Sequence, residues 1–183
     1  MKELALHLLD IAENSVAAKA KNITITVHFN TVNDRLQMSV EDDGTGMDAE
    51  RLAKITDPFV TSRTTRKVGL GIPLFKAAAE ACNGYFDIQS TPGKGTIVTA
   101  DFQESHIDRM PLGNLQSTIL SLLIGYPEIH WVMKVGRDED IFEFDDAPIK
   151  RELEGVSLTD PAVLEFLNEY LTSGIESTRI QTA

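Results

Sequence analysis

The stretch "EDDGTGMD", residues 41–48, follows directly on the alternating run "RLQMSV", residues 35–40. Aspartate and glycine are ordinary turn residues, so the stretch by itself is compatible with a surface turn. It also sets Asp43 beside Gly44 and Gly46, and an ionised carboxylate only accepts hydrogen bonds. Because glycine lets the backbone approach a ligand closely, the stretch is equally compatible with a binding site. The rest of the chain decides between these two interpretations.

Periodicity on both sides of this stretch predicts the fold class. Apolar and polar residues alternate in "ITITVHF" (23–29) as they do in 35–40, which predicts two strands joined by a hairpin loop. Helical periodicity precedes and follows these strands. The predicted elements are a helix at 3–20, strands at 23–29 and 35–40, a short helix at 49–56, a loop at 57–68, a helix from Gly69 to Asn83-Gly84, and strands at 85–90 and 96–102. This order indicates an α+β sandwich, in which one mixed sheet carries its helices on one face.

The charge distribution divides the chain into two parts. Residues 1–103 hold 11 basic and 13 acidic side chains, whereas residues 104–183 hold 6 basic and 15 acidic ones. We therefore expect a first domain at 1–103 and an acidic α/β extension of unknown role at 104–183. The extension is predicted to contain helices at 113–124 and 160–172 and strands near 129–135 and 140–144. Since no flexible linker separates the two parts, the extension is expected to pack against the first.

Composition argues against several classes of protein. The net charge of −11 disfavours general binding to nucleic acid or to an anionic membrane. With one cysteine, Cys82, and four scattered histidines, the sequence shows neither a disulfide framework nor a metal-binding cysteine cluster. The longest apolar stretch, "STILSLLIGY", is too short to span a membrane. We expect a cytoplasmic protein.

A basic segment stands out in this acidic chain. The loop "TSRTTRK" (61–67) carries three cations and no acid, and it precedes a helix that opens with Gly69 and Gly71. Helix N-termini attract anions through free N–H groups and the helix dipole. The segment therefore points to an anionic ligand, although a solvated loop is the plain alternative. The nearby "GKGT" (93–96) is not a P-loop, because position 88 is isoleucine and the segment joins two strands.

One face of the first predicted helix carries polar groups suited to a metal-bound nucleotide. His7, Asp10 and Asn14 fall on that face at helical spacing. Mg²⁺ typically takes only one or two protein oxygens, so the carboxamide of Asn14 is a plausible ligand. Adenine presents an amine donor where guanine presents an acceptor, so Asp43 would select adenine. We interpret His7 as a pocket or structural residue rather than a phosphoacceptor.

Five segments together resemble a known family. They are "DIAENSVAAKAKNI", "VEDDGTGM", "TDPFVTSR", "VGLGIPL" and "STPGKGTIVTADF", in this order within residues 1–103. They are similar to the boxes of the Bergerat-fold (GHKL) ATP-binding domains shared by gyrase, the heat-shock chaperone, histidine kinases and mismatch-repair MutL. The lid and last hairpin resemble histidine kinases most.

The resemblance implies ATP and Mg²⁺ as ligands and assigns the site residues. Asn14 would hold Mg²⁺ and Asp43 would accept from the adenine amine. The remaining roles are Gly44, Gly46 and Met47 lining the base pocket, Thr96 near the adenine, Arg63 and Lys67 as cations facing phosphate, and Gly69, Leu70 and Gly71 cradling phosphate. The family's general base, a glutamate, is replaced by Asp10, with Glu13 as the fallback.

The resemblance leaves two functions open. One is a stand-alone histidine-kinase-like or serine-kinase-like phosphotransferase that acts on a partner protein. The other is an ATP-gated interaction module with slow or no hydrolysis. The acidic extension resembles small ATP-binding proteins of anaerobic bacteria that are encoded beside iron hydrogenase subunits, which implies an anaerobic redox enzyme as the partner.

Overall fold

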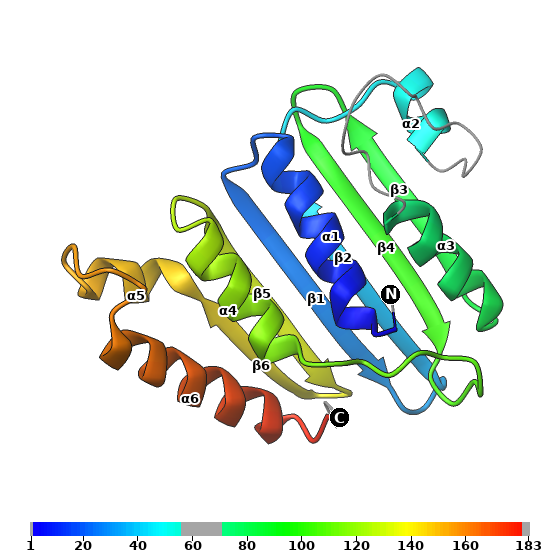
Figure 1. Cartoon of the computed structure of the whole chain (residues 1–183). Coiled ribbons are helices and arrows are strands. Elements are labelled where there is room, and N and C mark those ends of the chain that lie inside the picture. The colour runs from blue at the N-terminus through cyan, green and yellow to red at the C-terminus, as the bar shows by residue number, and fades with distance from the viewer. Residues whose placement is uncertain (1, 56–70, 181–183) are drawn as a thin grey trace.

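The computed structural model describes residues 2–55 and 71–180, which build one six-stranded sheet with helices on one face (Figure 1). The strand order is β3-β4-β2-β1-β5-β6, with β1 and β5 parallel and all other neighbours antiparallel. The elements are α1 Leu4–Ala17, β1 Asn22–Asn30, β2 Arg35–Asp42, α2 Ala49–Ile55, α3 Gly71–Ala81, β3 Tyr85–Thr91, β4 Gly95–Gln103, α4 Leu115–Gly125, β5 His130–Arg137, β6 Asp140–Asp145, α5 Asp146–Glu152 and α6 Pro161–Ser177. The predicted α+β class is confirmed. The predicted loop at 57–68 lies outside the described residues.

Alternation in the two central strands positions the site. Every second residue of β1 and β2 is buried on the helix-covered face, namely Ile23, Ile25, Val27, Phe29, Leu36, Met38 and Val40. Asp42 continues this alternation and lies opposite Ile23. A charged side chain thus ends an otherwise apolar row beneath α1, where burial is costly unless hydrogen bonds compensate it.

The end of α1 brings the helix against the glycine-rich stretch. The helix was predicted to reach residue 20 but ends at Ala17, because Lys19 has a left-handed φ of 61°. The Ala20 N–H then donates to the Ser15 carbonyl at 3.1 Å, a bond typical of helix termination. The next contact is with the stretch itself, since the Thr45 N–H donates to the Ala18 carbonyl at 2.8 Å.

The C-terminal segment continues the same sheet. β5 lies parallel to β1, with Asn22 opposite His130, and β6 pairs with β5 at the edge. Trp131 and Phe144 of these strands are buried in one core with residues of α1 and β2. The expectation that 104–183 packs against the first part is met through the sheet. The division at residue 103 stays a prediction.

The helices follow the order of the strands that they cover. Figure 1 shows α3, α1 and α4 side by side over the sheet, with α6 beyond α4 against β6. α6 begins as predicted, with the Asp160 side chain accepting from Ala162 N–H and Pro161 in the first turn. The short helix α5 was not predicted. The sheet therefore has α3 near one edge and α5 and α6 near the other.

Candidate functional site

The buried carboxylate of Asp42 is held by two donors. The Ser15 hydroxyl of α1 donates to Oδ2 at 2.6 Å, and the Gly44 N–H donates to Oδ1 at 2.8 Å. Asp42 is 9% exposed. Each carboxylate oxygen has a second lone pair, so the group can accept further hydrogen bonds from a ligand. Asp42 is thus an oriented acceptor at the end of β2, next to the C-terminal half of α1.

Asp43, which the sequence interpretation assigned to the adenine, lies on the exposed side of the chain next to Asp42. Its side chain is exposed and accepts from the N–H groups of Lys21 and Asn22 at 2.7 and 2.9 Å and from Asn22 Nδ2 at 2.6 Å. Partial burial acts to raise the pKa of Asp43, but the bonds from Asn22 and Lys21 outweigh it and hold that pKa below its ordinary value. The structure therefore does not bring Asp43 to the buried side of β2, because consecutive strand residues point to opposite faces.

Gly44 and Gly46 are required by close packing around Asp42. A Cβ on Gly44 would lie 2.8 Å from the Ala18 carbonyl oxygen and 2.9 Å from Asp42 Oδ1. Gly46 has a φ of +63°, and a Cβ there would overlap the Thr91 carbonyl. Both glycines let the loop after β2 fold tightly between α1 and the β3–β4 hairpin.

The β3–β4 hairpin closes the site beside Asp42. Thr96 is the register partner of Asp42, and its Oγ1 lies 2.8 Å from Ser90 Oγ. The Met47 N–H donates to the same Ser90 oxygen at 2.8 Å. The structure thus brings Gly44, Met47 and Thr96 together around Asp42 and Ser90, and their predicted role at the base stays a prediction. It adds Ser90 and Ser15, which sequence reasoning had missed.

The polar face of α1 turns toward the start of α3. A Cβ on Gly71, the first residue of α3, would lie only 2.5 Å from Asp10 Oδ2. Glycine at this position leaves room for the Asp10 carboxylate at the positive end of the α3 dipole. Asn14 is half-buried one turn further along α1, whereas Glu13 is exposed. Of the two carboxylates predicted as a general base, Asp10 therefore lies at the start of α3, whereas Glu13 is exposed.

Four predicted site residues, Arg63, Lys67, Gly69 and Leu70, lie outside the described residues. Their assignment to the phosphates stays a prediction.

His7 is a buried residue between α1 and α3. It is 2% exposed and its ring stacks on Phe75 of α3, with centroids 5.1 Å apart and planes 20° apart. Burial lowers the pKa of His7. A buried, stacked ring is consistent with the structural reading of His7.

This burial makes stability depend on pH. The folded chain keeps His7 neutral below its ordinary pKa of 6.5, so the unfolded chain binds the extra proton as the pH falls below that value. We expect the free energy of unfolding to decrease less in His7→Leu than in wild type between about pH 7.5 and about pH 5.5. Chemical denaturation at both pH values measures this. His28→Gln, which removes a histidine from the other face of β1, is the control. Equal decreases of the free energy of unfolding in wild type and His7→Leu would contradict the buried, neutral state of His7.

A family model now identifies the domain. The model of the histidine kinase-, DNA gyrase B- and HSP90-like ATPases matches residues 2–106, more than half of the chain and every described site residue. The chain belongs to this family. Among the described residues, none of the helices is long and apolar enough to cross a membrane.

Curated members of this ATPase family include bacterial sensor kinases. The chain is 39% identical over 92 residues to the sensor protein kinase FleS of Pseudomonas aeruginosa, covering 50% of this chain and 23% of that protein. It is 36% identical over 93 residues to the sensor histidine kinase ZraS of Klebsiella oxytoca, covering 50% and 20%. The chain thus spans about a quarter or less of these relatives. It carries an ATPase domain related to histidine kinase catalytic domains, which implies ATP binding.

A solved structure extends the similarity of fold beyond the family match. The Aquifex aeolicus MutL ATPase domain complexed with ADP superposes with a TM-score of 0.50 and 14% identity, covering 84% of this chain and 68% of that one. A match of that extent includes part of the segment after residue 106. The similarity of fold to this ATPase domain therefore reaches beyond residue 106.

Proposed function

We propose that this chain binds Mg-ATP with its adenine against Asp42 and transfers the γ-phosphoryl group to a partner protein. The observation that carries the proposal is the buried Asp42 carboxylate, fixed by Ser15 and Gly44 and still able to accept. The exocyclic amine of adenine is a donor of the required kind. Thr96, beside Asp42 in the sheet, would complete the contacts at the base. Asp42 thus replaces Asp43 in the role that the sequence suggested.

The phosphates would extend from Asp42 along α1 toward α3. The N-terminus of α3 offers free N–H groups and a partial positive charge to a phosphate. Asn14 lies between the Asp42 end of α1 and Asp10, and its carboxamide oxygen fits the hard-oxygen preference of Mg²⁺. When bound, the metal would neutralise phosphate charge. Arg63, Lys67, Gly69 and Leu70 would face the phosphates from the segment before α3.

Asp10 would act as the base for a hydroxyl acceptor. Its carboxylate lies against Gly71 at the start of α3, where the terminal phosphate is expected. From there it can take the proton of a serine hydroxyl or of water as the oxygen attacks phosphorus. A neutral histidine acceptor already presents a nucleophilic nitrogen and needs this base less. The sensor kinases among the relatives support the choice of a kinase.

One observation favours an ATP-gated module as a second candidate. Asp43, next to Asp42, binds Asn22, whose Oδ1 lies 3.0 Å from His130 Nδ1 at the start of β5. The other ring nitrogen of His130 lies 2.9 Å from Asp145 Oδ1, and Asp145 caps α5. A change at the adenine side would therefore reach the C-terminal segment through a short hydrogen-bond chain. This arrangement would suit a protein that signals its nucleotide state to a partner.

The base preference tests the proposed pocket. We expect ATP to bind at least about tenfold more tightly than GTP, because guanine would set a carbonyl oxygen against Asp42 and leave both groups unpaired. Isothermal titration of the full chain with each nucleotide, in the presence of Mg²⁺, measures both affinities. Equal affinities would mean that Asp42 does not read the base.

The metal role of Asn14 is tested separately from the base. In Asn14→Ala we expect Mg²⁺ to lose its enhancement of ATP binding, while the affinity for adenosine stays unchanged because adenosine carries no phosphate. Titrations with ATP and adenosine, with and without Mg²⁺, measure these effects. Glu13→Ala, an exposed neighbour on the same helix, is the control. If Mg²⁺ enhanced ATP binding in Asn14→Ala as much as in wild type, Asn14 would not be a ligand of the metal.

A further inference from the structure

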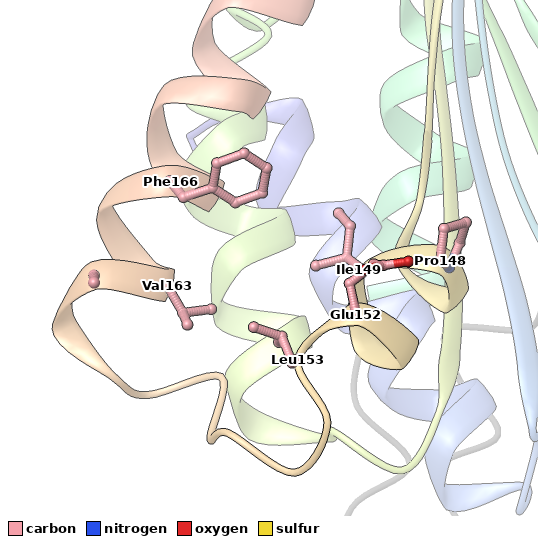
Figure 2. Close-up of a pocket in the computed structure, with 7 residues that line it drawn as sticks. Pro148, Ile149, Glu152, Leu153, Val163 and Phe166 are labelled. Atoms are coloured by element: carbon pink, nitrogen blue, oxygen red, sulfur yellow. The ribbon is translucent and has the colours of Figure 1, made fainter.

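An apolar groove opens between α5 and α6. It has a volume of about 390 Å³ and is lined by Pro148, Ile149, Glu152, Leu153, Ala162, Val163 and Phe166. Figure 2 shows side chains of both helices around it. Glu152 is the one charged side chain among the lining residues. A small-molecule site normally adds several polar groups that fix orientation, so this lining suits an apolar ligand surface better.

The apolar surface continues from the groove along α6. Phe166 is 52% exposed and stacks on Tyr170, which is 43% exposed, with ring centroids 5.8 Å apart. Tyr170 in turn contacts Phe142 of β6 edge-on, at 5.7 Å between centroids. Large aromatic rings left exposed in a row are typical of surfaces that bind another protein. The strip runs along a helix, which suits a ligand longer than the groove itself.

Acidic side chains border this strip. Glu165 and Glu169 neighbour Phe166 and Tyr170 on α6 and are exposed, and Glu152 reaches the groove from α5. Helix α5 carries two cations, Lys150 and Arg151. Lys150 Nζ lies 2.6 Å from Asp146 Oδ2 and 2.6 Å from the Ile129 carbonyl oxygen. The border of the groove is therefore predominantly negative, as is the whole segment 104–183.

We propose that this groove binds a basic amphipathic helix of a partner protein. Apolar side chains at helical spacing would enter the groove and cover Phe166, as in other helix-in-groove complexes. Lysine or arginine residues beside them would face Glu152, Glu165 and Glu169. A second copy of this chain is disfavoured as occupant, because a symmetric contact would set the same acids against each other. The site lies at the sheet edge opposite α3, so it goes beyond the proposed ATP-dependent function.

Fluorescence anisotropy with synthetic peptides tests the proposal on the full chain. The probe is a labelled peptide of about five helical turns, with leucines at i, i+3, i+4 and i+7 and lysines elsewhere. A matched peptide carries glutamates in place of the lysines. We expect the lysine peptide to bind at least about tenfold more tightly than the glutamate peptide, with an affinity that falls as salt rises. Equal binding of the two peptides would overturn the proposal.

Variants separate the groove from the overall charge. Phe166→Ala is expected to weaken binding of the lysine peptide at least about tenfold, as for an aromatic anchor. Glu165→Lys with Glu169→Lys should weaken it more than Glu80→Lys with Asp87→Lys, which changes the net charge equally at the opposite edge. Melting temperature and ATP affinity, expected to stay as in wild type, report on the fold. Ala162→Glu, at an exposed lining position, replaces Phe166→Ala if that variant does not fold.

Three results would overturn this assignment. The first is full binding of the lysine peptide by both Phe166→Ala and Ala162→Glu, and the second is equal weakening by the two charge reversals. The third is a dimer of the chain alone, seen by sedimentation and dissolved by Phe166→Ala. A dimer of this kind would make a second copy the occupant.

Discussion

Asp42→Asn is expected to lose ATP binding by about ten- to a hundredfold or more, whereas Asp43→Asn should bind ATP nearly as wild type does. The Asp42 carboxylate accepts from Ser15 and Gly44 and would accept from adenine. An asparagine there keeps the shape but turns one oxygen into a donor, and losing one charge-assisted hydrogen bond costs about 1.5–3 kcal/mol. Asp43 instead ties Lys21 and Asn22 together on the exposed side.

Isothermal titration of both variants with ATP decides between the two neighbours. Melting temperatures control for stability, because Asp42→Asn also leaves Ser15 or Gly44 without its full acceptor. Asp43→Asn losing ATP while Asp42→Asn keeps it would restore the assignment that the sequence suggested. Loss in both variants with unchanged melting temperatures would place both carboxylates at the nucleotide.

Asp10→Asn is expected to slow phosphoryl transfer to a hydroxyl, or hydrolysis, by about a hundred- to ten-thousandfold, which is the usual contribution of a general base. ATP affinity should change little, because asparagine preserves the shape beside Gly71. Transfer to a histidine should slow far less. Initial rates of phosphate release and of protein labelling measure the effect.

Glu13→Gln is the matched control for this experiment. Glu13 is exposed, so its loss should leave the rate near that of wild type. A rate that falls in Glu13→Gln and not in Asp10→Asn would move the base to Glu13. A rate unchanged in both variants would exclude a carboxylate base on α1.

The sequence predicted most of the elements because their patterns are local. Alternation at 23–29 and 35–40 became β1 and β2, and the Asp160-Pro161 signal became the start of α6. The pairing of β5 with β1 could not be predicted, because strand partners are set by contacts between segments more than a hundred residues apart. Helix α5 was missed since it begins directly after β6 and is only seven residues long.

The sequence interpretation did not single out Asp42 as the buried aspartate, although the strand pattern reaches it. The buried alternation Leu36, Met38, Val40 continues to Asp42, so the period of two already pointed to the first aspartate. The prediction ended the strand at residue 40 and lost that phase. Ser15 was missed for a different reason, since its role depends on the packing of α1 over the end of β2, which no local pattern reveals.

We infer that this chain binds ATP at Asp42 and passes its γ-phosphoryl group to a partner. The most direct measurement is incubation of the wild-type chain and Asp42→Asn with γ-phosphate-labelled ATP and a bacterial cell extract, followed by detection of labelled protein before and after acid treatment. We expect a labelled partner with the wild-type chain and none above background with Asp42→Asn. The label should be lost in acid if the acceptor is histidine and retained if it is serine. Neither labelled protein nor released phosphate, from a wild-type chain shown by titration to bind ATP, would contradict this inference.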